Sequence, residues 1–117
     1  MHEFGIAEEI VKSALAELEK LGKSAKLKRV QVVIGKLQEV IPENLALAYE
    51  TLSKGTRAES SELNIIDVPI VVKCAECGSD SPVSGISFTC SKCDSNNVNV
   101  VRGMELYLEK IQVEVDE

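Results

Sequence analysis

The fold of this chain is decided by two short stretches, Cys74-Ala-Glu-Cys77-Gly and Cys90-Ser-Lys-Cys93-Asp. Each stretch holds a C-x2-C pair, and twelve residues separate the two pairs. Two residues between cysteines allow a tight knuckle turn that directs both sulfurs at one ion. Four thiolates from two such turns complete a tetrahedron and leave no open position for a substrate. The spacing therefore predicts a closed four-cysteine site that holds a structural zinc ion.

The residues that follow the two cysteine pairs fit this interpretation. Gly78 and Asp94 stand where a knuckle needs a positive φ, which glycine adopts freely and aspartate tolerates better than most residues. The module around the cysteines has few apolar residues of its own. A bound metal would stabilise such a module, since zinc supplies roughly 10–16 kcal/mol of apparent binding free energy in zinc-finger peptides.

Three alternatives for the cysteine module stay open at this point. Iron in a rubredoxin-like site uses similar knuckles, and the cysteines could instead form two disulfides. A zinc ribbon that binds nucleic acid normally shows a basic or aromatic face. Here the charges from Lys73 to Arg102 balance, and Phe88 is the only aromatic residue between them.

The charge of the chain also argues against nucleic acid and membrane partners. Nineteen acidic and thirteen basic residues give the 117-residue chain a formal net charge of -6. Such a chain has no general attraction for nucleic acid or anionic lipid. We interpret the basic run at 20–29 as a solvated helix end and turn rather than as a binding patch.

No targeting pattern is evident in the sequence. The first residues lack the basic region and apolar stretch of a secretory signal, and no run approaches the roughly 18 apolar residues that cross a bilayer. We expect a cytoplasmic protein without a membrane partner, in which thiols stay reduced and paired cysteines more often hold metal than each other.

The remaining sequence predicts two helices and three strands around the cysteine module. A helical stripe of apolar residues precedes a C-cap at Gly22; it comprises Ile6, Ile10, Val11, Ala14, Leu15, Leu18 and Leu21. A second helix begins at Pro42 and ends at Gly55. The β-branched run 27–34 predicts a strand. Further strands are expected over 63–72, interrupted by Pro69, and over 104–115.

This order of elements predicts an α/β (α+β) fold. We expect a small mixed sheet of about three strands with two helices on one face, and a zinc-ribbon-like lobe with four cysteine ligands inserted between two strands. The predicted domains are 1–70 with 103–117, and the inserted segment 71–102.

The N-terminus offers a second candidate metal site. The single histidine of the sequence is His2, and a lone histidine is most often an ordinary surface or core side chain. At position 2, however, the Met1 amine, the His2 backbone nitrogen and the His2 imidazole can close adjacent chelate rings around one ion, with the Glu3 amide within reach. An all-nitrogen, near-planar set suits Ni(II) or Cu(II), not tetrahedral zinc.

Several segments along the chain form a pattern that is typical of one known family. They are Met1-His2-Glu3, Val33-Ile-Gly-Lys-Leu37 leading to Val40, Pro42-Glu-Asn-Leu45, Ala48-Tyr-Glu50, Lys54-Gly-Thr56, both cysteine pairs, and Glu105-Leu. In these segments the chain resembles the HypA family, the nickel metallochaperones of [NiFe]-hydrogenase maturation. The resemblance covers essentially the whole chain in order, and its most specific parts are the Met-His-Glu start and the spacing of the cysteine pairs.

The resemblance implies roles for particular residues. Met1 and His2 would bind nickel as transported cargo with support from Glu3, within the domain formed by 1–70 and 103–117. A structural zinc ion would be held by Cys74, Cys77, Cys90 and Cys93. The implied partners are a nickel-handling GTPase and the [NiFe]-hydrogenase large subunit; some bacterial members also serve urease. A homodimer is one option for the oligomeric state.

The sequence departs from part of the family in having no histidine near the cysteine pairs, so a mechanism that needs a second imidazole is in doubt. We expect no enzymatic activity, since no nucleophile–base pair, P-loop or open metal site is evident. GTP hydrolysis would then belong to a partner. The rival functions are a zinc-ribbon adaptor in transcription or translation and a small iron-containing electron carrier.

Overall fold

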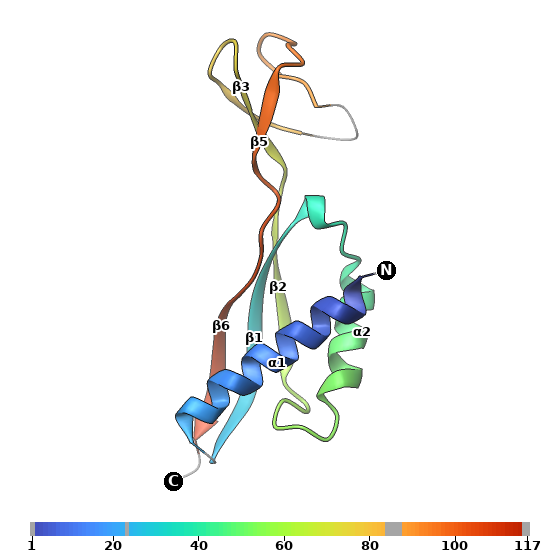
Figure 1. Cartoon of the computed structure of the whole chain (residues 1–117), viewed down its shortest axis with the longest axis vertical. Coiled ribbons are helices and arrows are strands. Elements are labelled where there is room, and N and C mark those ends of the chain that lie inside the picture. The colour runs from blue at the N-terminus through green and yellow to red at the C-terminus, as the bar shows by residue number, and fades with distance from the viewer. Residues whose placement is uncertain (1, 23, 84–87, 116–117) are drawn as a thin grey trace. The chain divides into compact units, whose positions relative to one another are not determined.

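The computed structural model describes residues 2–22, 24–83 and 88–115. Two helices, one short 3-10 helix and six strands occur in these segments (Figure 1). In chain order they are α1 (Glu3–Leu21), β1 (Ala25–Gly35), η1 (Lys36–Gln38), α2 (Pro42–Ser53), β2 (Glu62–Val68), β3 (Val71–Cys74), β4 (Asp80–Pro82), β5 (Val98–Arg102) and β6 (Leu106–Val115).

The chain divides into two compact units. Unit 1 contains 1–33, 40–66 and 107–117, and unit 2 contains 34–39 and 67–106. The structure therefore groups the 3-10 helix with the cysteine-bearing segment. The boundaries predicted from the sequence, at 70/71 and 102/103, stay a prediction.

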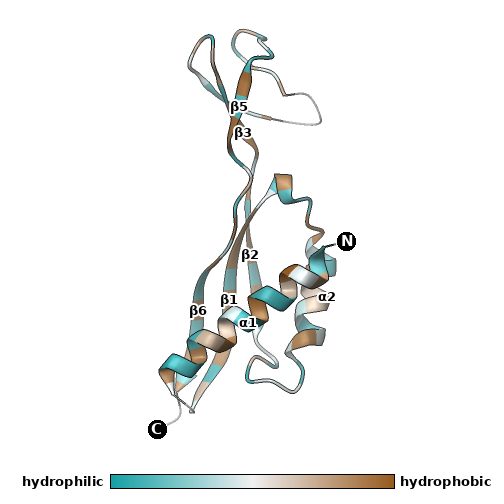
Figure 2. Cartoon of the chain, in the orientation of Figure 1, coloured by the Kyte–Doolittle hydropathy of each residue, from teal (hydrophilic) through white to brown (hydrophobic). Residues whose placement is uncertain are grey.

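Unit 1 is built on a three-stranded sheet in the order β2-β1-β6. Both helices lie on one face of this sheet (Figure 1), and α1 packs against α2. This arrangement confirms the predicted α+β fold class. β1 is the central strand; its first half mixes basic and apolar residues, and its second half is mainly apolar, so that Figure 2 shows both colours along it.

The buried face of α1 follows the predicted stripe, though more narrowly. Its buried apolar residues are Ala7, Ile10, Val11, Ala14 and Leu18. Leu21, at the end of the stripe, is instead exposed. The helix ends before Gly22, whose φ of 105° confirms the need for glycine there. Its other end starts at Glu3, and that carboxylate is buried although it is acidic.

β1 supplies the largest part of the sheet core. Ala25 and Leu27 are buried at alternate positions near the start of the strand, and every residue from Val32 to Gly35 is buried. The second half of β1 is therefore buried on both sides, which explains why a simple alternation is not visible in the sequence. α2 begins at Pro42 as predicted and buries Leu45, Ala48 and Tyr49.

The strand predicted over 63–72, with an interruption at Pro69, is two separate strands in the structure. β2 ends at Val68 and β3 begins at Val71, and the two strands belong to different sheets. Pro69 lies between them; it has no N–H to donate to a ladder, so the run ends there. The last predicted strand is also shorter than expected, because β6 begins at Leu106 rather than at Met104.

Unit 2 contains the second sheet, in the order β4-β3-β5, with both pairings antiparallel. The two outer strands were not predicted. Residues 34–39 join this unit through backbone hydrogen bonds: the Gly35 N–H donates to Glu105 O at 2.7 Å, and the Leu37 N–H donates to Gly103 O at 2.8 Å. Across the described ranges of both units, no helix is long and apolar enough to span a membrane.

Candidate metal centre

The four cysteines come together in unit 2. Their sulfur atoms all lie within 4.8 Å of one another. The Sγ atoms of Cys74 and Cys93 are 3.5 Å apart, as are those of Cys77 and Cys90. A tetrahedral ion with metal–sulfur bonds of about 2.3 Å places its ligands roughly 3.8 Å apart. The sulfurs are therefore already arranged as the corners of a site for one metal ion.

The first knuckle begins where β3 ends, at Cys74. Its N–H donates to Ser79 O at 2.9 Å, and its carbonyl accepts a hydrogen bond from the Gly78 N–H at 2.9 Å. The Glu76 and Cys77 N–H groups both donate to Cys74 Sγ at 3.4 Å. Gly78 has a φ of 74°. The turn therefore has the conformation predicted from the sequence.

The second knuckle repeats this pattern at Cys90. Its N–H donates to Ser95 O, and the Asp94 N–H donates to its carbonyl, both at 2.9 Å. The Lys92 N–H donates to Cys90 Sγ at 3.4 Å. Asp94 has a φ of 60°, which confirms the prediction that aspartate takes the place of Gly78 here. Each knuckle is thus specified by local sequence alone.

Contacts between the knuckles hold them in register. Ser95 Oγ donates to Glu76 Oε2 at 2.5 Å, and the Ala75 N–H donates to Asn97 O at 2.9 Å. Ser81 on β4 is buried behind the site and donates to Cys90 Sγ at 3.9 Å. Sequence reasoning missed these contacts because the partners are not close in the chain.

The thiol pKa values show why this cluster needs a cation. The Cys77 and Glu76 N–H groups lower the pKa of Cys74, and the Lys92 and Cys93 N–H groups lower the pKa of Cys90 to about 6. At Cys93 the Ser95 N–H acts in the same direction, but the neighbouring sulfurs and desolvation outweigh it and raise the pKa to about 12. Neighbouring thiolates repel one another, so a bound divalent metal would stabilise the deprotonated form of the cluster.

The geometry also decides against the disulfide alternative. All four cysteines are free thiols, and the sulfur separations of 3.5 Å exceed the roughly 2.05 Å of a disulfide bond. The cluster is therefore a donor set for a soft or borderline metal ion such as zinc or iron.

The N-terminal candidates lie in unit 1, at the start of α1. His2 directly precedes the helix, and its carbonyl accepts the first helical hydrogen bond, from the Ile6 N–H at 3.0 Å. Glu3 Oε2 accepts a hydrogen bond from the Ile41 N–H at 3.0 Å. This bond and the N–H of Glu3 itself lower the pKa of the Glu3 carboxyl. Met1 lies outside the described residues.

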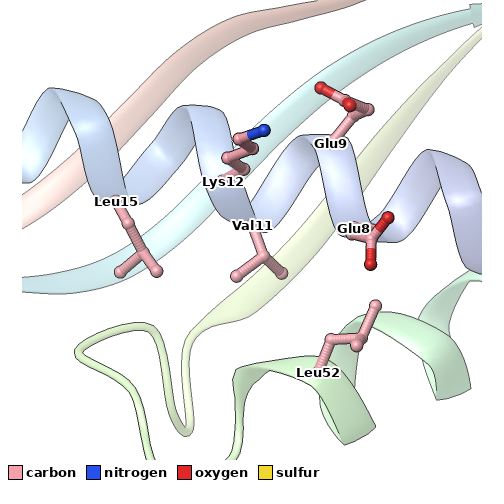
Figure 3. Close-up of a pocket in the computed structure, with 6 residues that line it drawn as sticks. All are labelled: Glu8, Glu9, Val11, Lys12, Leu15 and Leu52. Carbon is pink, nitrogen blue, oxygen red and sulfur yellow. The ribbon is translucent and has the colours of Figure 1, made fainter.

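A shallow groove lies between the two helices of unit 1. It has a volume of about 520 Å³ and is lined by Glu8, Glu9, Val11, Lys12, Leu15 and Leu52. Figure 3 shows the three apolar side chains facing the space between α1 and α2. The groove adds no metal ligand set to those described above.

Fold and site together define a class of protein: a small α+β unit joined to a lobe whose four cysteines can hold one metal ion. The family model described as "Hydrogenase/urease nickel incorporation, metallochaperone, hypA" matches residues 1–113. This chain belongs to the HypA family of nickel metallochaperones. The fold class and the resemblance drawn from the sequence are thereby confirmed.

Curated relatives agree with this assignment. Hydrogenase maturation factor HypA of Desulfatibacillum aliphaticivorans is 35% identical over 113 residues, which are 97% of this chain and 87% of the relative. Hydrogenase maturation factor HypA of Aquifex aeolicus is 30% identical over 116 residues, covering 99% of this chain and 100% of the relative.

Two solved structures share the fold. One is described as the solution structure of HypA protein, with a TM-score of 0.72, 23% identity, and coverage of 99% of this chain and 98% of the other. The second is the solution structure of the Ni metallochaperone HypA from Helicobacter pylori, with a TM-score of 0.65, 23% identity, and coverage of 99% and 100%. At these identities the likeness establishes the fold.

Proposed function

We propose that this chain binds Ni(II) at its N-terminus and delivers the ion during maturation of [NiFe]-hydrogenase. The proposed ligands are the Met1 amine and the His2 backbone and imidazole nitrogens. Glu3 supports the site from the first turn of α1. The hydrogen bond from the Ile41 N–H to Glu3 carries the proposal, because it holds the residue next to His2 at a fixed point of unit 1.

The negative charge of Glu3 would also favour a cation at the N-terminus of α1. The N-terminus of a helix carries a partial positive charge, which disfavours a cation nearby. The Glu3 carboxylate lies in the first turn of α1, and its lowered pKa keeps it ionised. Its negative charge offsets the helix dipole, so that an ion bound through His2 is not repelled.

For the four-cysteine cluster we propose a structural zinc ion held by Cys74, Cys77, Cys90 and Cys93. The closed tetrahedral arrangement supports zinc, and iron is the competing ion. Metal analysis of protein prepared without added metal separates the two. Replacement by Co(II) should give the absorption of a tetrahedral thiolate complex, whereas a red, redox-active preparation would identify iron.

We assign the nickel-binding role to the part formed by 1–70 and 103–117 and the zinc-binding role to 71–102. The proposed partners in the cytoplasm are a nickel-handling GTPase and the [NiFe]-hydrogenase large subunit. Nucleotide hydrolysis belongs to the GTPase partner in this proposal. The family description also names urease, so urease is the recipient to test if hydrogenase maturation does not depend on this chain.

Substitution of the single histidine tests whether nickel and zinc are bound by separate sets of ligands. His2→Ala should abolish nickel binding and leave the zinc content unchanged, because the two ligand sets lie in different units. Lys12→Ala, at an exposed position of α1, serves as a matched surface control and should bind nickel as the wild type does. Unchanged nickel affinity in His2→Ala would remove the basis of the proposal.

A further inference from the structure

The cysteine cluster combines accessible and protected sulfurs. Cys77 and Cys93 are exposed, whereas Cys74 and Cys90 are buried. Two pairs of sulfur atoms lie 3.5 Å apart, Cys74 with Cys93 and Cys77 with Cys90, and each pair joins one exposed cysteine to one buried cysteine of the other knuckle. An oxidant from solution can thus reach the exposed cysteine of each pair. The buried cysteine lies close enough to react with the oxidised sulfur in a second step.

We propose that the zinc-loaded lobe is a peroxide-sensitive switch, in which oxidation forms the disulfides Cys77–Cys90 and Cys74–Cys93 and releases the zinc ion. The inference rests on the proposed zinc occupancy of the cluster and goes beyond it. It assigns to the four cysteines a redox function in addition to a structural one.

The chemistry balances with a hydroperoxide as the oxidant. The Cys77 sulfur attacks a peroxide oxygen, so that an S–O bond forms, the O–O bond breaks, and the leaving hydroxide takes a proton to become water. The Cys90 sulfur then attacks the Cys77 sulfur; the S–S bond forms and the second hydroxide leaves as water. Two thiolates, one peroxide and two protons give one disulfide and two waters. A second peroxide oxidises Cys93 and Cys74 in the same way.

Loss of zinc follows from the ligand count. The first disulfide removes two of the four thiolate ligands, and a structural zinc site needs all four positions filled. The sulfur distances require only a further approach of about 1.5 Å to reach a disulfide bond length of roughly 2.05 Å, and departure of the ion leaves the space for it.

The pairing across the knuckles has a structural consequence that pairing within a C-x2-C motif would not have. A disulfide within one knuckle leaves no covalent link between the two knuckles once the ion has left. Disulfides between knuckles instead tie the end of β3 to the segment before β5, where the hydrogen bond between Ser95 and Glu76 already joins the two turns. The oxidised lobe therefore keeps its knuckles together, which favours return to the zinc form after reduction.

The experiment uses the zinc-loaded full chain and hydrogen peroxide. Zinc is measured before and after oxidation with a colorimetric chelator, beside a count of free thiols. Oxidised protein is then cut with trypsin and a glutamate-specific protease, which cleave after Lys73, Glu76, Lys92 and Arg102. The proposed pairing yields fragment 77–92 alone with an internal disulfide, and fragment 74–76 linked to 93–102. The two other possible pairings are Cys74–Cys77 with Cys90–Cys93, and Cys74–Cys90 with Cys77–Cys93. Each of them links all three fragments into one species.

The expected result is release of one zinc per chain in step with the loss of thiols, the two fragment species described, and recovery of zinc binding after dithiothreitol and zinc are added. Cys77→Ser should still form the Cys74–Cys93 disulfide. Retention of zinc and thiols under peroxide, or a single species of three linked fragments, would overturn the inference. Absence of zinc before peroxide is added would contradict the zinc assignment itself, and this inference with it.

Discussion

The carboxylate of Glu3 accepts a hydrogen bond from the backbone N–H of Ile41, 38 residues further along the chain. Glu3 is only 5% exposed, and Ile41 is the residue directly before α2. The contact therefore joins the beginnings of the two helices of unit 1. It gives the third residue of the chain a structural role beside the supporting role proposed for nickel binding.

Two substitutions at position 3 separate these roles. Glu3→Ala removes the acceptor and leaves the Ile41 N–H without this partner, so we expect a lower free energy of unfolding. Glu3→Gln keeps an acceptor oxygen and should retain most of the stability, but it removes the negative charge and should weaken nickel binding. Denaturant unfolding and nickel titration measure the two effects. Equal loss of stability in both variants would show that the charge, not the hydrogen bond, holds the contact.

Any side chain larger than hydrogen at position 35 should clash with the backbone of Gly103. A Cβ built on Gly35 would lie 2.1 Å from the backbone carbon and oxygen of Gly103, although the Gly35 backbone is extended and suits any residue. Gly35→Ala should therefore destabilise the protein by about 1–3 kcal/mol through overpacking.

Gly5 provides the matched control for that substitution. Nothing lies within 4 Å of a Cβ built there, and the residue is inside α1. Gly5→Ala should raise the free energy of unfolding by about 0.5–1 kcal/mol, because alanine loses less conformational freedom in a helix. Thermal or denaturant unfolding of both variants checks the pair, and a similar change in both would contradict the predicted clash at Gly35.

The buried hydroxyl of Tyr49 should make the free energy of unfolding depend on pH in the alkaline range. Its hydroxyl lies 2.5 Å from Ser61 Oγ, which donates its one hydrogen to Ala58 O at 2.5 Å, so Tyr49 is the donor to Ser61. Burial raises the pKa of Tyr49 above its ordinary value. The stabilisation is fully present below the unfolded-state pKa of about 10 and is lost as the pH rises through the higher folded-state pKa.

The measurement is the difference in unfolding free energy between the wild type and Tyr49→Phe as the pH rises. This difference should fall above about pH 10, because only the wild type has the buried hydroxyl to ionise. Tyr107→Phe, at an exposed tyrosine, controls for the loss of a tyrosine hydroxyl. A difference that stays constant with pH would count against burial as the cause of the raised pKa.

Removal of the proposed zinc ion should affect the two units differently. The four thiolates would repel one another without the ion, and the described residues of the lobe include few buried apolar side chains beyond Val72. Because zinc binding contributes on the order of 10 kcal/mol in comparable modules, we expect a chelator to unfold the strands of the lobe while α1 and α2 persist. Amide NMR spectra report on each unit separately. Unchanged signals from Val72 and Val100 after complete zinc removal would contradict the prediction.

The sequence predicted the parts of the structure that depend on local geometry. The knuckle turns, the positive φ at Gly78 and Asp94, and the helix start at Pro42 each follow from a few neighbouring residues. The β-branched run before Gly35 likewise predicted the strand that lies at the centre of the sheet. These residues favour a strand by their intrinsic propensity, and the fold buries them in one.

The remaining features depend on contacts between distant parts of the chain. The apolar run on both sides of Pro69 predicts one strand, yet its halves pair in different sheets. Likewise, the partner of Glu3 lies 38 residues away, and the two sulfur contacts of 3.5 Å each join cysteines of different knuckles. Residue spacing identifies which groups can act together, but the tertiary fold decides which of them are adjacent.

Nickel binding through the N-terminus is tested by titrating Ni(II) into the zinc-loaded protein that begins at Met1, beside the same protein with Gly-Ser added before Met1. Calorimetry and ultraviolet absorption follow both titrations. We expect about one nickel ion per chain that begins at Met1 and an affinity at least about tenfold weaker in the extended chain, a loss of roughly 1.4 kcal/mol or more, because the added residues remove the Met1 amine from the chelate. Equal affinities in the two forms, or no binding by either, would contradict nickel binding through the N-terminus.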